Sequence, residues 1–209
     1  EAEHADQFEL GVKGGNQRVS HQISAYYNRI ENFLTGQILS GPAAIAACGA
    51  ANAGNCKKNV NLGSVTIKGI AGNARWQVVP GHWLNAGFST LRGQNDDLDE
   101  PLFQMPADEA TLGWLGHVWR NVEADFTLRM VDRQDRVATR FSNGSENPTP
   151  GFVTADIGAT WRFARQQQMR LAIRNLADKD YHEHLTEGLS GQEISAPGRS
   201  LQLSWGGKF

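Results

Sequence analysis

The chain has 209 residues, with 20 Lys and Arg, 22 Asp and Glu, and a formal net charge of −2. This near balance offers no basic surface for nucleic acid, which excludes that class of partner. No apolar run approaches the roughly 20 residues that a membrane helix needs, so a helical membrane protein is excluded. A membrane barrel is still allowed, because alternation dilutes its apolar residues. Gly is frequent at 23 residues and Pro is scarce at 7, which favours an all-β chain.

The start of the chain, Glu1-Ala2-Glu3-His4, contains neither an initiator Met nor a signal peptide. An exported protein carries such a signal. We therefore expect this chain to be a piece of a longer precursor.

Alternating apolar and polar residues predict nine β-strands. The most regular one lies at 122–136, where the alternation runs without a break from Val122 to Met130. In the third strand the alternation changes phase around Gly69, which predicts a β-bulge. The expected strands cover about 6–14, 18–39, 59–79, 82–95, 107–119, 122–136, 151–163, 169–176 and 199–209.

The last expected strand ends the chain on an aromatic residue. Leu201, Leu203 and Trp205 alternate with polar residues, and the sequence stops at Phe209. A terminal aromatic residue suits the last strand of an outer-membrane barrel, where aromatic girdles mark the membrane boundary. Other aromatic residues also lie near strand ends, so we expect girdle positions at Trp161, Phe163, Trp205 and Phe209.

Connections between the expected strands alternate in length. Short turns are expected at 15–17, 79–81, 120–121 and 164–168, and long loops at 40–58, 96–106, 137–150 and 177–196. Short turns at one rim and long loops at the other are typical of outer-membrane barrels. A soluble β-sandwich also alternates, with its polar face in water, and is the alternative. The rim asymmetry and the aromatic residues favour the barrel.

The expected strand count is odd, whereas single-chain bacterial barrels have even numbers of strands. We therefore expect the C-terminal portion of a larger barrel. Its first strand would be left with an open edge, which we expect to pair with another strand.

Cys48 and Cys56 lie eight positions apart in a stretch rich in Gly, Ala and Asn. We expect them to form a loop disulfide in an oxidising compartment. A metal-binding pair is the weaker alternative, because no His lies between or beside them.

Three motifs of the chain are similar to those of a known family. The segment Asp6-Gln7-Phe8-Glu9-Leu10-Gly11 resembles the opening of a late barrel strand in the TonB-dependent outer-membrane receptors. Asn175-Leu176-Ala177-Asp178-Lys179-Asp180-Tyr181 resembles the segment before the last extracellular loop. Pro197-Gly198-Arg199, followed by the strand to Phe209, resembles the family's C-terminus. The spacing among the motifs fits, and the resemblance covers essentially the whole chain.

Four further segments look most like the TonB-dependent copper receptors. They are Leu102-Phe103-Gln104-Met105-Pro106, Asp132-Arg133-Gln134-Asp135-Arg136-Val137, Pro148-Thr149-Pro150-Gly151-Phe152 and Tyr181-His182-Glu183-His184-Leu185. A Tyr-x-x-His-Leu run also occurs in receptors for ferric chelates, so a ferric-siderophore receptor is an alternative.

The resemblance implies a 22-stranded transmembrane β-barrel with an N-terminal plug inside it. Residues 1–209 would be one C-terminal part of that barrel, roughly its strands 14 to 22. The plug, the segment that binds TonB and the first strands would lie outside this chain. The implied location is the outer membrane of a Gram-negative cell, with the long loops extracellular. The implied partners are outer-membrane lipid, the TonB system and a metal or metal chelate.

His182 and His184 form the most suggestive cluster for a ligand. Imidazole is a common metal ligand, and residues at i and i+2 of an extended chain face the same way. The alternative is a motif that only holds the base of the loop. Met105, in an expected loop, is a candidate soft ligand for Cu(I), whereas Met130 is expected to face lipid.

Four arginines on the expected polar faces are candidates for binding an anionic siderophore, namely Arg129, Arg162, Arg170 and Arg174. The alternative is that they pair with Asp125, Asp156 and plug carboxylates. The acidic run 96–100 could collect cations, or could simply be a solvated loop.

The sequence contains no nucleophile elbow, phosphate loop or His-Glu-x-x-His motif, so we expect neither an enzyme nor a resident cofactor. The leading hypothesis is a receptor for TonB-dependent uptake of a metal or metal chelate. A passive barrel, such as a porin or an adhesin, is the alternative from a different class.

Overall fold

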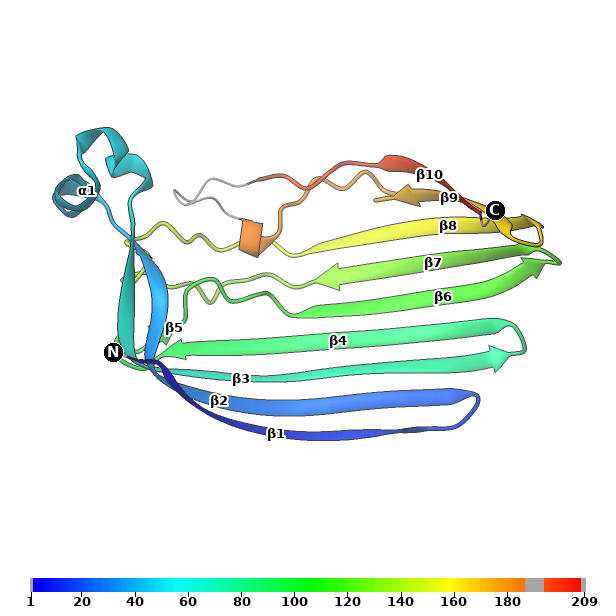
Figure 1. The fold of residues 1–209 in the computed structure, drawn as a ribbon, viewed down its shortest axis with the longest axis horizontal. Coiled ribbons are helices and arrows are strands. Elements are labelled where there is room, and N and C mark those ends of the chain that lie inside the picture. Colours follow the sequence, from blue (N-terminus) through cyan, green and yellow to red (C-terminus); the bar gives the residue numbers. More distant parts are fainter. Residues whose placement is uncertain (1, 187–193, 208–209) are drawn as a thin grey trace.

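The computed structural model describes residues 2–186 and 194–207. Nearly all of its regular structure is one antiparallel sheet, in which each long strand lies beside the next one in the chain (Figure 1). The elements are β1 (His4–Gly15), β2 (Val19–Ile38), α1 (Gly41–Cys48), η1 (Ala50–Asn55), β3 (Lys57–Val79), β4 (His82–Asn95), β5 (Glu100–Pro101), β6 (Glu109–Trp119), β7 (Val122–Val131), β8 (Phe152–Ala164), β9 (Gln167–Arg174), η2 (His184–Thr186) and β10 (Ser200–Gly207).

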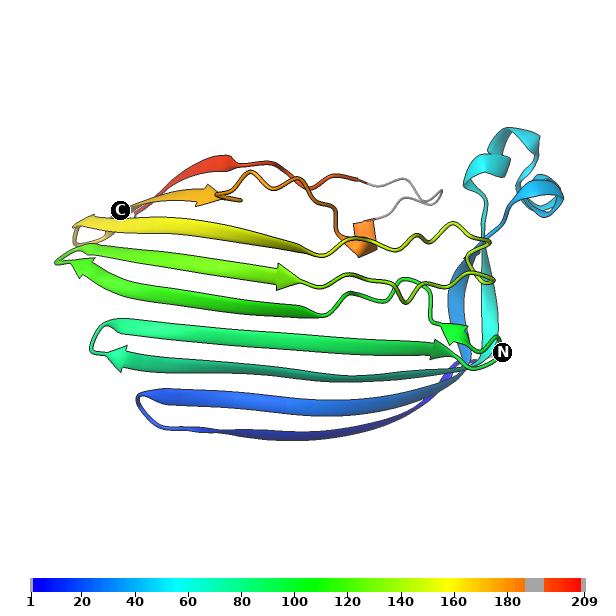
Figure 2. The ribbon, with the colours of Figure 1, turned by 180° about the vertical axis from the view of Figure 1, so that it is seen from behind.

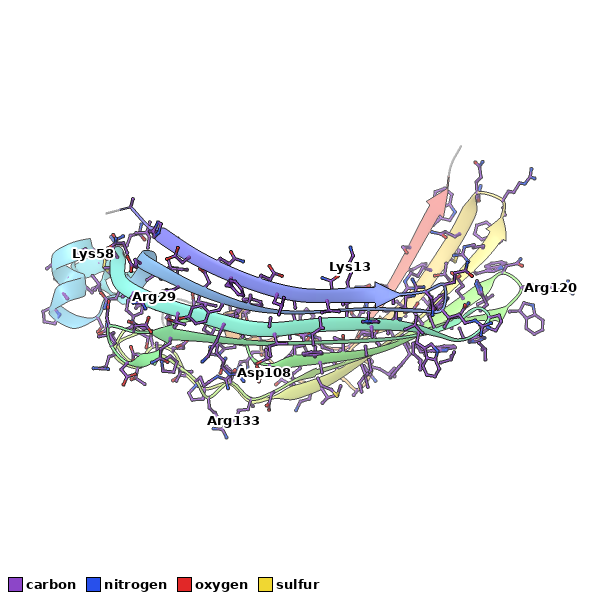
Figure 3. All side chains as sticks on the ribbon, turned by 90° about the horizontal axis from the view of Figure 1, so that it is seen from below. Lys13, Arg29, Lys58, Asp108, Arg120 and Arg133 are labelled. Carbon is purple, nitrogen blue, oxygen red and sulfur yellow. A yellow bond between two sulfur atoms is a disulfide. The ribbon has the colours of Figure 1, made fainter. Side chains whose placement is uncertain are left out.

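The sheet is an open, curved wall. Its order is β1-β2-β3-β4-β6-β7-β8-β9-β10, with the two-residue strand β5 beside β4. Viewed along its edge, the wall bends into a trough (Figure 3). Strands β1 and β10 form its two margins, and neither has a second strand beside it within the described residues. This confirms the expected all-β, antiparallel arrangement. No helix in the described part of the chain is long and apolar enough to cross a membrane.

One face of the sheet, called the apolar face below, is apolar across all the long strands. Leu112 lies opposite both Ala86 and Leu128, and Leu171 lies opposite Leu203. Large side chains on this face stay exposed, which leaves far more apolar surface uncovered than a soluble monomer carries. They include Phe8, Leu10, Val12, Ile23, Ile70, Leu84, Phe88, Leu112, Phe126, Ile157, Leu171, Leu201 and Leu203.

The other face, called the polar face below, carries charged and hydrogen-bonding side chains. Arg129 lies opposite Thr111 and Thr154, and Lys13 lies opposite Gln22. Lys13 points into the concave side of the trough (Figure 3). The strict two-residue period of a strand separates the two faces, since successive side chains point to opposite sides.

The prediction of a β-bulge at Gly69 is wrong. Gly69 pairs in register with both Tyr26 and Leu91, so the ladder continues through it. A Cβ atom on Gly69 would lie 2.5 Å from the hydroxyl of Tyr26, which crosses over this position. The glycine therefore makes room for a neighbouring side chain. Register shifts occur beside short turns instead, between Gln77 and Val79, His117 and Trp119, and Arg162 and Ala164.

Strand β7 ends at Val131, well before the end expected from alternation. Beyond that point Gln134 forms an isolated backbone bridge with Thr149. The side-chain amide of Gln134 also donates to the carbonyl oxygens of Met105 and Pro106, both at 2.8 Å. These contacts with other loops turn the chain out of the sheet.

The first long connection is partly helical, although the sequence predicted only a loop. It contains α1 and η1, and a disulfide joins Cys48 to Cys56 with their Cα atoms 5.9 Å apart. Pro42 lies in the first turn of α1, where its missing N–H is not needed. The disulfide closes the base of this small helical loop.

Glycines on the polar face leave space for ion pairs that cross strands. The guanidinium of Arg170 on β9 reaches over Gly158 on β8 to bond both carboxylate oxygens of Asp125 on β7, at 2.5 and 2.9 Å. A Cβ atom on Gly158 would lie 2.5 Å from Arg170 Nη2 and 2.9 Å from Asp125 Oδ1. Any side chain at this position would displace the pair.

We expect Gly158→Ala to destabilise the full-length protein by about 1 kcal/mol, because it displaces a charge-assisted pair. Gly113→Ala is the matched control, since a Cβ there meets its nearest atoms at 3.7 Å, an ordinary contact. Urea unfolding in detergent micelles measures both variants. Equal stability of the two would contradict the crossing pair.

Candidate functional site

The long connections all lie at one end of the sheet and the short turns at the other (Figures 1 and 2). This confirms the predicted asymmetry. Among the described residues, the loop end carries 39–56, 96–108, 132–151, 175–186 and 194–199, and the turn end carries 16–18, 80–81, 120–121 and 165–166. Contacts among the loops make the loop end the candidate functional site.

A small apolar core lies at the loop end. Ile30 on β2 and Val65 on β3 are opposite each other and buried. Leu102 from the loop 96–108 and Phe141 from the loop 132–151 pack against them. This core gives the loops a fixed base on the wall.

Glu100 ties two loops together. Its side chain is buried and accepts hydrogen bonds from the backbone N–H groups of Thr139, Arg140 and Phe141 at 3.0, 3.0 and 2.8 Å. Burial raises the pKa of this carboxyl, but these backbone donors outweigh burial and leave the pKa below its usual range. In its charged form, the Glu100 carboxylate therefore holds the loop 132–151 in place.

Glu146 is the point where three loops meet. Its carboxylate accepts from the N–H of Gln104 at 2.6 Å and from the N–H of Ala138 at 2.5 Å. His184 Nε2 lies 3.1 Å from the same carboxylate, and His184 Nδ1 lies 3.3 Å from the hydroxyl of Thr149. The imidazole of His184 is thus used by protein partners at both ring nitrogens.

Arg129 attaches the last loop to the sheet. Its guanidinium bonds Glu109 on β6 at 2.7 Å and Glu183 of the last loop at 2.5 Å. The guanidinium also lies 5.2 Å from the ring centre of Phe152. An arginine with two carboxylates and an aromatic ring is strongly positioned, since each contact favours the same orientation.

These residues enclose a cavity of about 170 Å³ between the last loop and the polar face. Its lining includes Pro106, Arg129, Phe152, His182, Glu183 and His184. Two histidines and three acidic residues, Glu109, Asp132 and Glu183, therefore line one small space.

The structure brings two of the three predicted metal contacts together. His182 and His184 line the same cavity, and His182 forms a backbone bridge with Ser195. Met105 packs into the apolar core, where its sulfur lies 2.5 Å from the place a Cβ on Gly93 would take. Among the described residues, no group of three or more His, Cys, Asp or Glu side chains is placed to hold a metal ion.

The four candidate arginines for an anionic ligand are all paired with carboxylates. This matches the alternative that they balance charge on the polar face. The pairs are Arg129 with Glu109 and Glu183, Arg162 with Glu123, Arg170 with Asp125, and Arg174 with Asp156.

The acidic run 96–100 is built into the loop end. Asp97 accepts from the N–H of Gly63 at 2.5 Å, and Asp96 accepts from the hydroxyls of Ser64 and Thr66 at 3.0 Å. Sequence reasoning missed these roles and the role of Glu146, since a carboxylate that binds a backbone N–H has no sequence signature.

The predicted girdle positions lie near the turn end. Trp161 and Trp205 both pair with Met169, from either side of β9. The rings of Trp161 and Phe163 are 5.1 Å apart. Phe209 lies outside the described residues.

The lowered pKa of Glu100 predicts how the loops respond to acid. A carboxyl whose pKa is lowered in the folded state stabilises that state fully at a pH above its ordinary pKa of 4.5. It loses this contribution as the pH falls through the lowered pKa. Spin labels at Asp99 and Arg140, both exposed, report the distance between the two loops. The distribution of this distance should stay narrow from pH 7 to 5 and should broaden only when the pH falls below the ordinary pKa of a glutamate. In Glu100→Gln the distribution should not change across this acid range. Acid broadening that persists in Glu100→Gln would contradict the role of this carboxylate.

Comparisons with known proteins agree with this geometry. Residues 1–176 match the family model described as TonB dependent receptor-like, beta-barrel. A comparison with curated proteins gives no significant match.

Among solved structures, the chain is similar to the copper transporter OprC, with a TM-score of 0.82 and 22% identity over 97% of this chain and 31% of that one. It is also similar to the FrpB iron transporter from Neisseria meningitidis, with a TM-score of 0.75 and 18% identity over 100% of this chain and 32% of that one. A mutant of the ferric enterobactin receptor PfeA from Pseudomonas aeruginosa gives a TM-score of 0.73 and 16% identity over 99% and 31% of the two chains.

At these identities the structural likeness shows the fold alone. The chain spans about a third of the length of each of these structures. The family model, which covers residues 1–176, decides the family. The chain therefore belongs to the family of TonB-dependent receptor-like β-barrels.

Proposed function

We propose that this chain is part of an outer-membrane receptor that takes up a metal ion or metal chelate, foremost copper, in a TonB-dependent manner. The observation that carries this proposal is the family match over residues 1–176. The exposed apolar face supports it, because such a face suits contact with lipid around a barrel. The paired charges on the polar face suit the barrel interior.

In the whole receptor, the margins β1 and β10 pair with the other barrel strands. The long loops are extracellular and capture the ligand, and a plug inside the barrel holds it. TonB, driven by the inner-membrane proton gradient, then displaces the plug. These steps follow from the family. This chain contributes wall and loops.

The loop end supports a metal or a metal chelate as the ligand class. His182, His184 and Met105 are the proposed contacts, since imidazole and thioether groups suit copper. The geometry supports them unequally, since Met105 packs against the apolar core and does not line the histidine cavity. His184 binds Glu146 and Thr149, so it also holds the loops. His182 lines the cavity next to it and is the leading contact.

A ferric siderophore is the second candidate ligand. A hollow of about 340 Å³ on the polar face is lined in part by Arg174, Tyr181 and Gln202, which suits a larger polar ligand. Against this candidate, Arg174 is paired with Asp156 at 2.7 Å. An anionic ligand would have to replace that carboxylate.

The test uses the full-length receptor and compares Cu(I), Zn(II) and a ferric siderophore by calorimetric titration. We expect copper to bind most tightly, and His182→Ala to weaken copper binding roughly tenfold or more. His117→Ala is the matched control, because His117 lies near the turn end. Copper that binds no better than zinc or the siderophore would overturn the copper assignment.

Uptake by cells separates the receptor from a passive barrel. Copper uptake through the receptor should be lost in cells without TonB. Uptake that continues without TonB would indicate a porin-like channel.

A further inference from the structure

Charged residues end the apolar series of six neighbouring strands at the loop end. On the apolar face, each follows the last apolar position of its strand or lies beside that strand's end, except that Thr90 separates Arg92 from Phe88. In sheet order, from β1 to β7, they are Asp6, Arg29, Lys68, Arg92, Asp108 and Asp132.

Three of these residues are adjacent cations. Lys68 on β3 lies opposite Arg92 on β4, and on its other side it lies opposite Tyr27 on β2. Arg29 lies two positions beyond Tyr27, on the same face and toward the loops. Arg29 and Lys68 are exposed. Figure 3 shows Arg29 toward the loop end and Arg120 at the opposite end.

Carboxylates neutralise only part of this cluster. Arg92 bonds both oxygens of Asp108 at 2.6 Å, which fixes its position. Within the described part of the chain, neither Arg29 nor Lys68 forms an ion pair, although Asp6 lies opposite Arg29 in register. Lys68, at the centre of the row, therefore carries the least compensated charge.

The position of this charged row on the wall determines which part of a surrounding membrane it contacts. Toward the turn end, Ile70 is the next residue after Lys68 on this face, and Phe88 lies beyond Thr90. In a membrane those side chains contact acyl chains, so the first charged row lies level with the headgroups. A cation at that level attracts phosphate, and its aliphatic stem packs on the apolar surface.

We propose that Arg29, Lys68 and Arg92 form a site on the outside of the barrel for a phosphate-bearing lipid headgroup of the outer leaflet. Lys68 contacts the phosphate, Arg29 flanks it, and Arg92 is held beside it by Asp108. The site rests on the proposed membrane placement but is independent of the transported ligand. It lies on the opposite face of the sheet from the histidine cavity.

The test is binding of diphosphorylated lipid A to the full-length receptor in neutral detergent, followed by native mass spectrometry. The double variant Arg29→Gln, Lys68→Gln should bind about fivefold more weakly for each cation removed, as about 1 kcal/mol per cation predicts. Monophosphorylated lipid A should bind more weakly than the diphosphorylated form. Raising the salt concentration should reduce the difference between wild type and variant.

The matched control is Arg120→Gln, Arg165→Gln, which removes the same charge from two short turns at the other end. This control should bind lipid A as the wild type does, and Lys68→Arg should retain binding. Equal binding by wild type and the double variant, or an equal loss in the control, would overturn the site. Heat-modifiable gel mobility checks that each variant folds. A receptor that does not enter detergent micelles or bilayers at all would instead overturn the proposed function.

Discussion

Two buried carboxylates determine how the loop end is organised. A carboxylate taken out of water is stable only when hydrogen bonds replace its hydration. Glu100 obtains those bonds from backbone N–H groups of the loop 132–151. Glu146 obtains one from Gln104 in the loop 96–108 and one from Ala138 in its own loop. The two loops therefore order together, because neither buried carboxylate is satisfied by donors of its own loop alone. The cavity with His182 and His184 lies beside the last loop, which is held by Glu146 through His184 and by Arg129 through Glu183.

The same requirement shapes the polar face of the wall. Its arginines cross strands to reach carboxylates, and they do so where a neighbour has no side chain, as Arg170 does over Gly158. The apolar face needs no such pairing, since its exposed side chains suit lipid. Where the apolar series ends, charged residues return, and the uncompensated Lys68 follows from that change of environment. One sheet thus provides a balanced interior, a lipid contact and a base for the loops.

The strands were predictable because a half-buried strand alternates with a period of two, whatever its neighbours are. The bounds of β4 agree with the expected 82–95. Predictions failed where distant contacts decide the outcome. The side chain of Gln134 donates to a loop carbonyl, and β7 ends before it. The side chain of Tyr26 crosses over Gly69, which accounts for a glycine at this position without a bulge. The pairing of His184 with Glu146 joins positions 38 residues apart, so the sequence could show the two histidines but not what holds them.

Hydrogen exchange on the unmodified full-length receptor tests the central claim most directly. The amides of residues 138–141 donate to Glu100 and Glu146, apart from any strand ladder. If the two carboxylates hold the loops as one unit, these amides should exchange as slowly as those in the middle of β3. Exchange at the rate of an unstructured peptide would contradict the account.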